Sequence, residues 1–273
     1  MTEVDLIISL GRGNFSTITM VIHEGQSVVR KRATTRLVDG IEEDTIKDLD
    51  NEYRILCQLH HPHIISPIVR KDTLEGDREF LLPLYSMDLN HYIQKQYNPP
   101  SSLVMKFISQ LSSALNHIHE LGIVHCDVKP ANILCDLEKE IIVLIDFGFA
   151  EKETPDDAYH RRNGEDDYAR GSLLYMAPER VHHPRLFSRF SDMWSWALVG
   201  YFLFARAEPW FNYHTKRQFM RDLSENRLIS QLSKPEHCPA LMWELFRSCW
   251  VYPFASRPSA KTCQETIQST ENY

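Results

Sequence analysis

The chain has 273 residues, of which 43% are hydrophobic and 25% charged, as is usual for a folded globular protein. Its formal net charge of −7 argues against nucleic acid as a partner, because phosphate backbones select basic surfaces. The longest apolar run, residues 194–205, is shorter than the roughly 20 residues that span a bilayer, so it predicts a buried helix and no membrane segment.

The cysteines and the N-terminal residues predict the compartment. The six cysteines are scattered without C-x-x-C spacing, and a chain of this length needs no disulfides to fold. Residues 1–5 are acidic where a signal peptide would be basic. We therefore expect reduced thiols and an intracellular protein, cytoplasmic or nuclear.

The first ninety residues predict antiparallel strands and one helix. Strands are expected at residues 6–10, 17–23, 27–32, 64–69 and 80–85. Pro83 should lie at a strand end or edge, because proline donates no backbone hydrogen bond. Alternation along the third strand directs Lys31 to the same face as Val29 and leaves Arg30 and Arg32 to solvent.

The helix of this region is expected from about residue 42 to residue 59, where apolar side chains recur at spacings of three and four. Glu42 and Glu43 would then lie in its first turn, where acidic side chains favour the helix dipole.

After Pro100 the chain predicts mainly helices. One is expected over residues 101–121, ended by Gly122, and a buried one over residues 194–205 with Ser191 or Asp192 near its start. Two more are expected near residues 239–250 and 259–267. The apolar run at residues 141–145 predicts a short strand.

An acid, a cation and an amide occur close together in residues 123–134. They are Asp127, Lys129 and Asn132, and Pro130 prevents them from lying on one continuous helix. Apolar pairs on both sides of this loop can anchor it, so that the three side chains converge. Such a group suits phosphoryl transfer, in which a carboxylate orients a hydroxyl, a lysine neutralises a phosphoryl oxygen and an amide oxygen binds magnesium.

Residues 123–134 resemble the catalytic loop of eukaryotic-type protein kinases, whose pattern is H-R-D-L-x-x-x-N. Residues 146–148 resemble the D-F-G motif of that family, and residues 177–179 resemble A-P-E. The resemblance extends from about residue 10 to residue 257. It implies an α+β, two-lobed fold in a single domain of residues 1–273. The N-lobe, about residues 1–85, would be an antiparallel sheet with one helix, and the larger C-lobe, about residues 88–273, would be mainly helical.

The resemblance also implies ATP and Mg²⁺ as cofactors and a role for each site residue. Asp127 would be the catalytic base and Lys129 would neutralise the transferred phosphoryl group. Asn132 and Asp146 would bind magnesium. The phosphates of ATP would be held by Lys31, paired with Glu52. The other expected nucleotide contacts are Leu10, Gly11, Arg12, Gly13, Asn14, Phe15, Ser16, Ile18, Val29 and Leu134.

The glycine turn before residue 16 has a second interpretation as a dinucleotide-binding loop. That fold requires a helix directly after the glycines, whereas the pattern here continues as a strand, so we reject it. The third glycine of the kinase pattern is Ser16 in this chain.

Two features of the sequence favour serine and threonine of proteins as substrates. Lys129 lies two residues after Asp127, and Ser172 lies seven residues before Glu179, as in serine/threonine kinases. Dual specificity, a pseudokinase scaffold and a small-molecule kinase are the alternatives. The resemblance further implies a buried ion pair between Glu179 and Arg257.

One departure from the family pattern concerns regulation. Cys126 stands where the catalytic loop usually has arginine, and a thiol cannot pair with a phosphate on the segment between residues 148 and 171. The acidic residues 165–167 could instead pair with nearby arginines at positions 161, 162 and 170. The alternative is that this loop is mobile.

Overall fold

The computed structural model divides the chain into two compact units. Unit 1 comprises residues up to Ser86 together with Ile145–Gly148, and unit 2 comprises Met87–Leu144 and the chain from Phe149 onward. The structure describes residues 8–12, 16–33, 36–38, 41–43, 45–72, 78–95, 98–153, 171–183, 186–210, 213 and 215–270.

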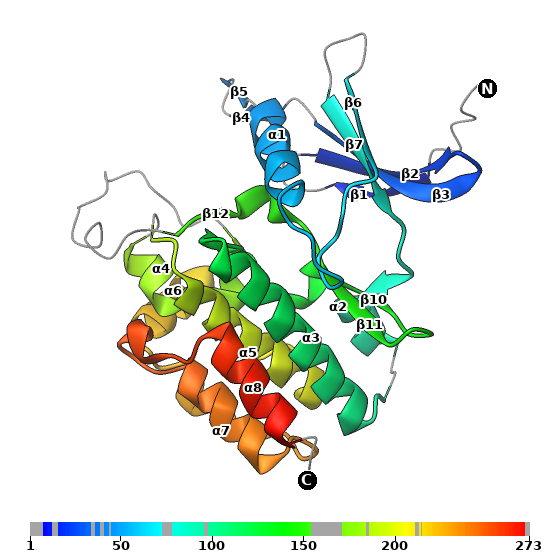
Figure 1. Ribbon diagram of the computed structural model, residues 1–273. Coiled ribbons are helices and arrows are strands. Elements are labelled where there is room, and N and C mark those ends of the chain that lie inside the picture. The colour runs from blue at the N-terminus through cyan, green and yellow to red at the C-terminus, as the bar shows by residue number, and fades with distance from the viewer. Residues whose placement is uncertain are drawn as a thin grey trace. The chain divides into compact units, whose positions relative to one another are not determined.

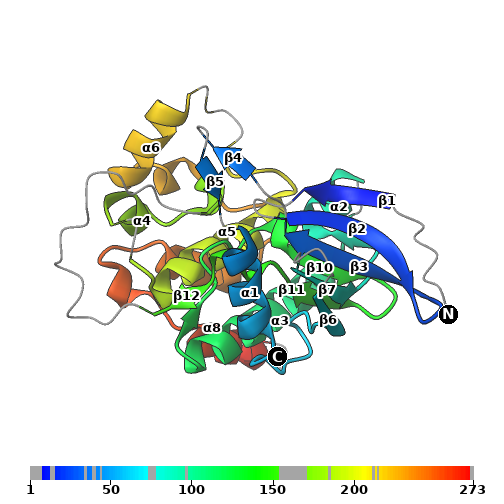
Figure 2. The same ribbon diagram turned by 90° about the horizontal axis from the view of Figure 1, so that it is seen from above.

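Unit 1 contains a five-stranded antiparallel sheet in the order β1-β2-β3-β7-β6 (Figure 1). Seen from above in Figure 2, β1, β2 and β3 run side by side. The strands are β1 (Ile8–Arg12), β2 (Ser16–His23), β3 (Gln26–Ala33), β6 (Val69–Asp72) and β7 (Arg78–Pro83). The strand expected at residues 64–69 is therefore misplaced by several residues, because the ladder begins only after Pro67.

The β2–β3 hairpin is joined by a two-residue turn. Glu24 and Gly25 both have positive φ, 50° and 80°, which suits the right-handed twist of the strands on either side. Beyond it Val21 and Val28 pack with Leu81 in the sheet's apolar cluster. Pro83 ends β7, at the strand end that its missing amide donor requires.

The helix of unit 1, α1 (Thr45–Leu56), begins later than expected. Residues 41–43 form strand β5 (Ile41–Glu43), which pairs with β4 (Arg36–Val38). The prediction that Glu42 and Glu43 lie in the first helical turn is therefore wrong. Here the pairing of this segment with a neighbouring strand overrides the helical spacing of its side chains. Such pairing cannot be predicted from the spacing alone.

Unit 2 is mainly helical. Helix α3 (Ser101–Glu120) packs against α5 (Arg189–Ala205) and α8 (Ala260–Thr270), and α5 packs against α7 (Ala240–Cys249) (Figure 1). The shorter helices are α2 (Leu89–Gln94), α4 (Pro178–His182) and α6 (Lys216–Ser224). The expected fold, an antiparallel sheet with one helix followed by a mainly helical region, is confirmed.

The ends of the two long central helices follow from their sequences. Gly122 has φ 65° just beyond α3, which confirms the expected stop. Helix α5 begins at Arg189, before the start expected near Ser191 or Asp192, because Ser188 caps it by accepting a hydrogen bond from the amide of Phe190. Since Ser188 is the N-cap residue, Asp192 does not cap this helix. Within the described residues no helix is both long and apolar enough to cross a membrane.

Short strands flank residues 125–132, the part of unit 2 that resembles the kinase catalytic loop and is called the catalytic loop below. Strand β10 (Ile133–Asp136) lies between β11 (Ile141–Leu144) and β8 (Met87–Asp88), and β9 (Ile123–Val124) pairs with β12 (Glu151–Lys152). Strands β9 and β10 therefore anchor the loop at both ends, and their apolar residues are largely buried.

All six cysteines lie within the described residues and are free thiols. Cys57, directly after α1, is exposed, and Cys126 in the catalytic loop is half-buried. The other four are buried.

Candidate functional site

Lys31 lies in unit 1 on β3, and its ammonium group contacts two carboxylates. It donates to Oε1 of Glu52 at 2.6 Å and to Oδ1 of Asp146 at 2.8 Å. Glu52 comes from α1, and Asp146 comes from the four-residue segment that belongs to unit 1 by its contacts. The expected pairing of Lys31 with Glu52 is therefore present.

The charges of this cluster support one another. Burial disfavours the ammonium form of Lys31, but the carboxylates of Asp146 and Glu52 outweigh this effect, so the pKa of Lys31 is raised above its ordinary value. Lys31 therefore stays cationic. Burial also raises the pKa of Glu52, against the attraction of Lys31. Since Glu52 is buried, it holds Lys31 in place rather than reaching solvent.

The sequence predicted that the flanking arginines of β3 would face solvent, but in the structure each has a carboxylate nearby. Arg30 and Arg32 each lie 3.8 Å from Oε2 of Glu79 on the neighbouring strand β7. Glu79 is buried, and sequence analysis missed it because a partner across a sheet shows no signal in local spacing. The one carboxylate of Glu79 thus offsets part of the positive charge of these two arginines within the sheet.

The expected phosphate-covering turn connects β1 to β2. Gly11 pairs with Ile18 across these strands, next to a register shift, while residues 13–15 lie outside the described residues. Ser16 is buried, and its hydroxyl has no hydrogen-bond partner among the described residues. Ile18 in turn pairs with Lys31 in the sheet register, so two expected nucleotide contacts lie opposite each other.

In unit 2 the three polar side chains of the catalytic loop converge, as expected. Lys129 donates to Oδ2 of Asp127 at 2.7 Å, and the amide nitrogen of Asn132 donates to the same oxygen at 2.9 Å. Pro130 begins a short 3₁₀ turn that ends at Asn132, so the proline shapes this loop as its fixed φ allows. Asp127 is buried, so this carboxylate is held rigidly.

Ser172 completes this cluster from a separate segment. Its hydroxyl accepts a hydrogen bond from Lys129 at 2.6 Å, and its backbone amide donates to Oδ1 of Asp127 at 2.7 Å. Gly171, just before it, has φ 112°, and a Cβ there would lie 2.7 Å from the carbonyl oxygen of Cys126. Only glycine fits this approach.

The backbone of the loop is held by Asp192 of α5, a contact that sequence analysis missed. Oδ2 of Asp192 accepts from the amide of His125 at 2.8 Å and Oδ1 accepts from the amide of Cys126 at 3.0 Å. His119 of α3 also contacts Oδ2, at 2.9 Å. Burial raises the pKa of Asp192, but the hydrogen bond and charge of His119 and the contacts at His125 outweigh it, so the net shift is downward. Cys126 has φ 66°, a conformation that this clamp supports.

The buried ion pair between Glu179 and Arg257 is confirmed. Two parallel hydrogen bonds join them, at 2.7 and 2.8 Å, and their side chains are 1% and 0% exposed. Ser191 also donates to Glu179, and the Arg257 guanidinium lies over the ring of Trp194. This network ties α4 to α5 and to the turn before α8.

Glu153 marks the last described residue before the gap at residues 154–170. Arg189 at the start of α5 donates to both of its carboxylate oxygens. Burial raises the pKa of Glu153, but the hydrogen bonds and charge of Arg189 outweigh it and lower the pKa. The acidic residues 165–167 and the arginines at 161, 162 and 170, proposed to pair, lie outside the described residues.

Comparison with protein-family models matches "Protein kinase domain" over residues 5–267, nearly the whole chain. The chain belongs to the protein kinase family. The Lys31–Glu52 salt bridge is consistent with the lysine–glutamate pair of that family.

Among curated relatives of this kinase, Serine/threonine-protein kinase ULK3 of Rattus norvegicus is 31% identical over 239 residues, covering 83% of this chain and 46% of the relative. Dual specificity protein kinase shkA of Dictyostelium discoideum is 25% identical, covering 94% and 47%. Tyrosine-protein kinase ZAP-70 of Homo sapiens is 22% identical, covering 96% and 41%. The kinase domain therefore spans about half the length of these relatives.

The residues present fit the cofactors that the kinase family implies. The side-chain hydrogen bonds of Asn132 to the described residues all leave from its amide nitrogen, so its amide oxygen is available to a cation. Lys31 offers a permanent positive charge and Ser16 a buried hydroxyl. Carboxylate and amide oxygens suit magnesium, and cationic and hydroxyl donors suit phosphates.

Proposed function

We propose that this protein kinase transfers the γ-phosphoryl group of ATP to serine and threonine hydroxyls of protein substrates. The observation that carries this proposal is the cluster of Asp127, Lys129 and Ser172. A buried carboxylate that accepts hydrogen bonds from a lysine, an asparagine and a backbone amide has one fixed orientation.

In this proposal Asp127 orients the substrate hydroxyl and accepts its proton. Lys129, already 2.7 Å from Asp127, neutralises charge on the phosphoryl group during transfer. Ser172 keeps Lys129 close to Asp127 through its 2.6 Å contact. The loop therefore needs no large rearrangement to reach a catalytic geometry.

The nucleotide-binding roles remain part of the same proposal. Lys31, steadied by Glu52, holds the α- and β-phosphates, and residues 11–16 cover them through backbone amides. Asn132 and Asp146 are the proposed magnesium ligands, and the bound metal would neutralise charge on the phosphate oxygens. Leu10, Ile18, Val29 and Leu134 form the proposed adenine contacts.

Serine/threonine specificity is supported by Lys129 and Ser172 and by the ULK3 relatives. Dual specificity is the second candidate, because a dual-specificity and a tyrosine kinase also match most of the chain. A pseudokinase scaffold has no chemical need to hold Lys31, Glu52 and Asp127 in these arrangements. A small-molecule kinase gives no reason for the A-P-E segment and its buried ion pair.

The test is an assay with radiolabelled ATP, magnesium and a mixture of generic protein substrates, followed by phosphoamino acid analysis. We expect phosphoserine and phosphothreonine without phosphotyrosine, and loss of transfer in Asp127→Asn. Phosphotyrosine in similar amount would establish dual specificity instead. Equal transfer by Asp127→Asn and the parent protein would refute the catalytic assignment, and no transfer by either would favour the scaffold.

A further inference from the structure

A groove in unit 1 follows one face of α1, the helix that lies beside β7 in Figure 1. Its volume is about 660 Å³, within the roughly 300–1,000 Å³ that is usual for ligand sites. We call it the α1 groove. Its described lining residues are Lys47, Asp50, Asn51, Tyr53, Arg54, Cys57, Gln58 and Arg70.

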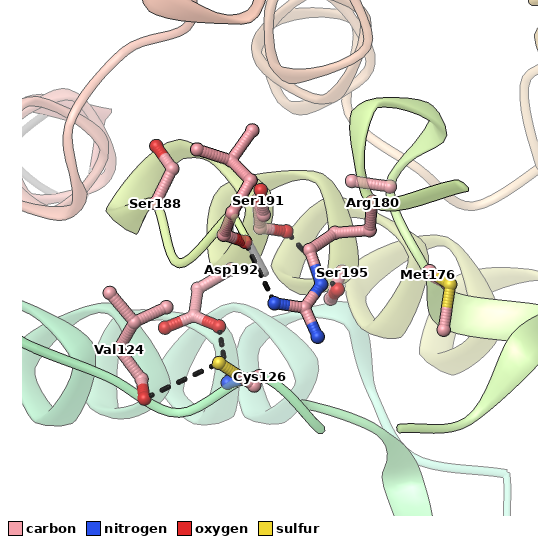
Figure 3. A pocket seen from close by; sticks show the side chains of 10 residues that line it. Val124, Cys126, Met176, Arg180, Ser188, Ser191, Asp192 and Ser195 are labelled. Carbon is pink, nitrogen blue, oxygen red and sulfur yellow. Dashed lines mark hydrogen bonds between the residues drawn. The ribbon is translucent and has the colours of Figure 1, made fainter. Parts of the chain in front are cut away.

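The pocket of Figure 3, beside the catalytic loop in unit 2, is much smaller. Its volume is about 10 Å³, which leaves room for at most one water molecule. Figure 3 shows the carboxylate of Asp192 directed at the amide of Cys126, which is 3.0 Å away. That pocket therefore belongs to the anchoring of the loop, whereas the α1 groove is large enough for a ligand.

The α1 groove lies on the side of the helix that faces away from Glu52. The lining positions on the helix recur at spacings of three and four, so they share one face. Glu52, which holds Lys31, is buried on the opposite side. A ligand in the groove would therefore not compete with Lys31 for Glu52.

The lining carries more positive than negative charge, in a chain whose formal net charge is −7. Lys47, Arg54 and Arg70 are cationic, and Asp50 is acidic. Arg70, which comes from β6, lies 3.1 Å from Oδ1 of Asp50, and Arg78 of β7 contacts Oδ2. One carboxylate thus faces two guanidinium groups, and it leaves a positive surplus in the groove.

Arg54 supplies a positive charge that has no carboxylate partner among the described residues. Its guanidinium donates to the amide oxygen of Asn51 at 2.7 Å, which is a neutral partner. The side chain is exposed and lies on the lined face of the helix. A carboxylate in the groove could therefore bind this guanidinium without displacing an existing ion pair.

The rest of the lining favours recognition by charge and hydrogen bonds. No aliphatic side chain occurs among the described lining residues, so they offer no apolar anchor site. The ring of Tyr53 is packed against its neighbours, with the Arg70 guanidinium 5.3 Å and the ring centre of Phe80 5.5 Å from its own centre. Little of this ring remains for a nucleotide base to stack on, which disfavours a single-stranded nucleic acid.

We propose that the α1 groove binds an acidic peptide segment of a partner protein in extended conformation. Lys47 to Leu56 of α1 span about 14 Å at 1.5 Å per residue, which matches about four extended residues at roughly 3.3 Å each. Carboxylates of the peptide would bind Arg54 and Lys47 on the helix and the remaining donors of Arg70. Asn51 can donate hydrogen bonds to the peptide backbone, and Gln58 can accept them.

Cys57 provides a native sensor of the groove, because its thiol lines it and is the exposed one among the six cysteines. A bound peptide should shield this thiol from N-ethylmaleimide, a small neutral reagent. The rate of modification of the full chain is measured by intact mass at low ionic strength, with and without acetylated hexaglutamate amide. Cys57→Ser should take up no reagent on the same time scale, which identifies Cys57 as the modified thiol.

We expect saturating hexaglutamate to slow the modification of Cys57 about fivefold or more. Sodium chloride at about 0.5 M should remove this protection, because salt screens exposed charges. Neutral hexaglutamine of the same length should not protect. The concentration for half-maximal protection should rise about tenfold or more in Arg54→Glu, relative to that variant's own unprotected rate, and less in Arg54→Gln.

Two control variants separate the groove from other cations. Arg217→Glu reverses the charge of an exposed arginine on α6, in unit 2, and should leave the half-maximal concentration at the parent value. Lys31→Ala should also leave it unchanged, because Lys31 pairs with the opposite side of α1. These readouts require no kinase activity, so they hold even if the proposed function fails.

The inference would be overturned if hexaglutamate left the modification rate of Cys57 unchanged, or if hexaglutamine protected equally. An Arg54→Glu variant with the parent's half-maximal concentration and melting curve would also refute it, and if Arg54→Glu does not fold, Arg54→Gln decides. Equal or stronger protection by oligodeoxythymidylate would make the groove a nucleic-acid site. Equal protection by inorganic phosphate at the same concentration of charge would reduce it to a site for small anions.

Discussion

Glu179 and Arg257 are 78 positions apart in the chain and meet through two buried, parallel hydrogen bonds. Such a pair is strongly destabilising to break, because the partner left behind is a buried charge without compensation. We expect Arg257→Ala to reduce the free energy of unfolding by roughly 3–5 kcal/mol. Urea unfolding followed by circular dichroism measures this, with exposed Arg247→Ala as the control. An unchanged midpoint in Arg257→Ala would show that the pair adds nothing to stability.

Lys31 and Asp146 are expected to be essential for transfer. Lys31→Ala removes the cation proposed to hold the phosphates, and Asp146→Ala removes a proposed magnesium ligand. Both variants should lose phosphoryl transfer and remain folded, the first because Glu52 can take up a proton once its partner is gone. Activity and melting curves are compared with Lys106→Ala, which removes an exposed lysine. Near-normal turnover with an unchanged melting curve in either variant would make its assignment wrong.

Gly171→Ala should damage both stability and activity. The new methyl group would lie 2.7 Å from the carbonyl oxygen of Cys126, and the positive φ adds strain of about 1–3 kcal/mol. Gly122→Ala is the matched control, since Gly122 also has positive φ but a methyl group there would meet no other atom within 4 Å. The difference between the two melting temperatures reports the steric contact together with the greater backbone strain at φ 112°, compared with φ 65° at Gly122. Equal melting temperatures would mean that the backbone near Gly171 can move to accommodate the methyl group without a loss of stability.

The acid stability of the chain should depend on Asp192. Its pKa is lower in the folded protein than its ordinary value of 3.8, so the ionised form binds His119 and the loop amides favourably. This contribution is complete above pH 3.8 and is lost as the pH falls through the lower, folded-state pKa. Urea midpoints measured from pH 7 down to about pH 3 should fall less steeply in Asp192→Asn than in the parent. Glu236→Gln, which removes an exposed carboxylate, is the control, and a slope in Asp192→Asn as steep as the control's would contradict the assignment.

Activity is expected not to depend on phosphorylation between Gly148 and Gly171. Cys126 carries no positive charge to pair with a phosphate there. One preparation replaces Thr154, Tyr159 and Tyr168 together, and a second treats the native enzyme with phosphatase. Both should turn over at the rate of untreated enzyme. A large loss of activity in both would show that phosphorylation is necessary. A cationic side chain at a position other than 126 would then have to bind the phosphate.

The sequence correctly predicted most features that depend on residues close together in the chain. The convergence of Asp127, Lys129 and Asn132 follows from spacing and one proline, and the helix stop at Gly122 follows from its conformational freedom. The family pattern added Glu52 and Arg257, which no local period could identify. Spacing and pattern together thus predicted the outline of the site.

The errors concern contacts made across the fold. Glu79 lies 3.8 Å from each of two arginines of a neighbouring strand, and Asp192 holds backbone amides 66 and 67 positions away. Backbone amides as partners leave no mark in the sequence, because every residue except proline has one. The segment that contains Glu42 pairs as a strand, because its partner β4 outweighs the helical periodicity that continues from α1.

Cys57 has a practical consequence for studying this protein. It is the one exposed thiol among the six cysteines, all of which lie in described parts of the chain, and it follows the last residue of the helix that carries Glu52. A maleimide dye should therefore attach there first, without an engineered cysteine, and report on the environment of that helix. The same exposure makes purified protein prone to intermolecular disulfide dimers, so a reducing agent belongs in every storage buffer.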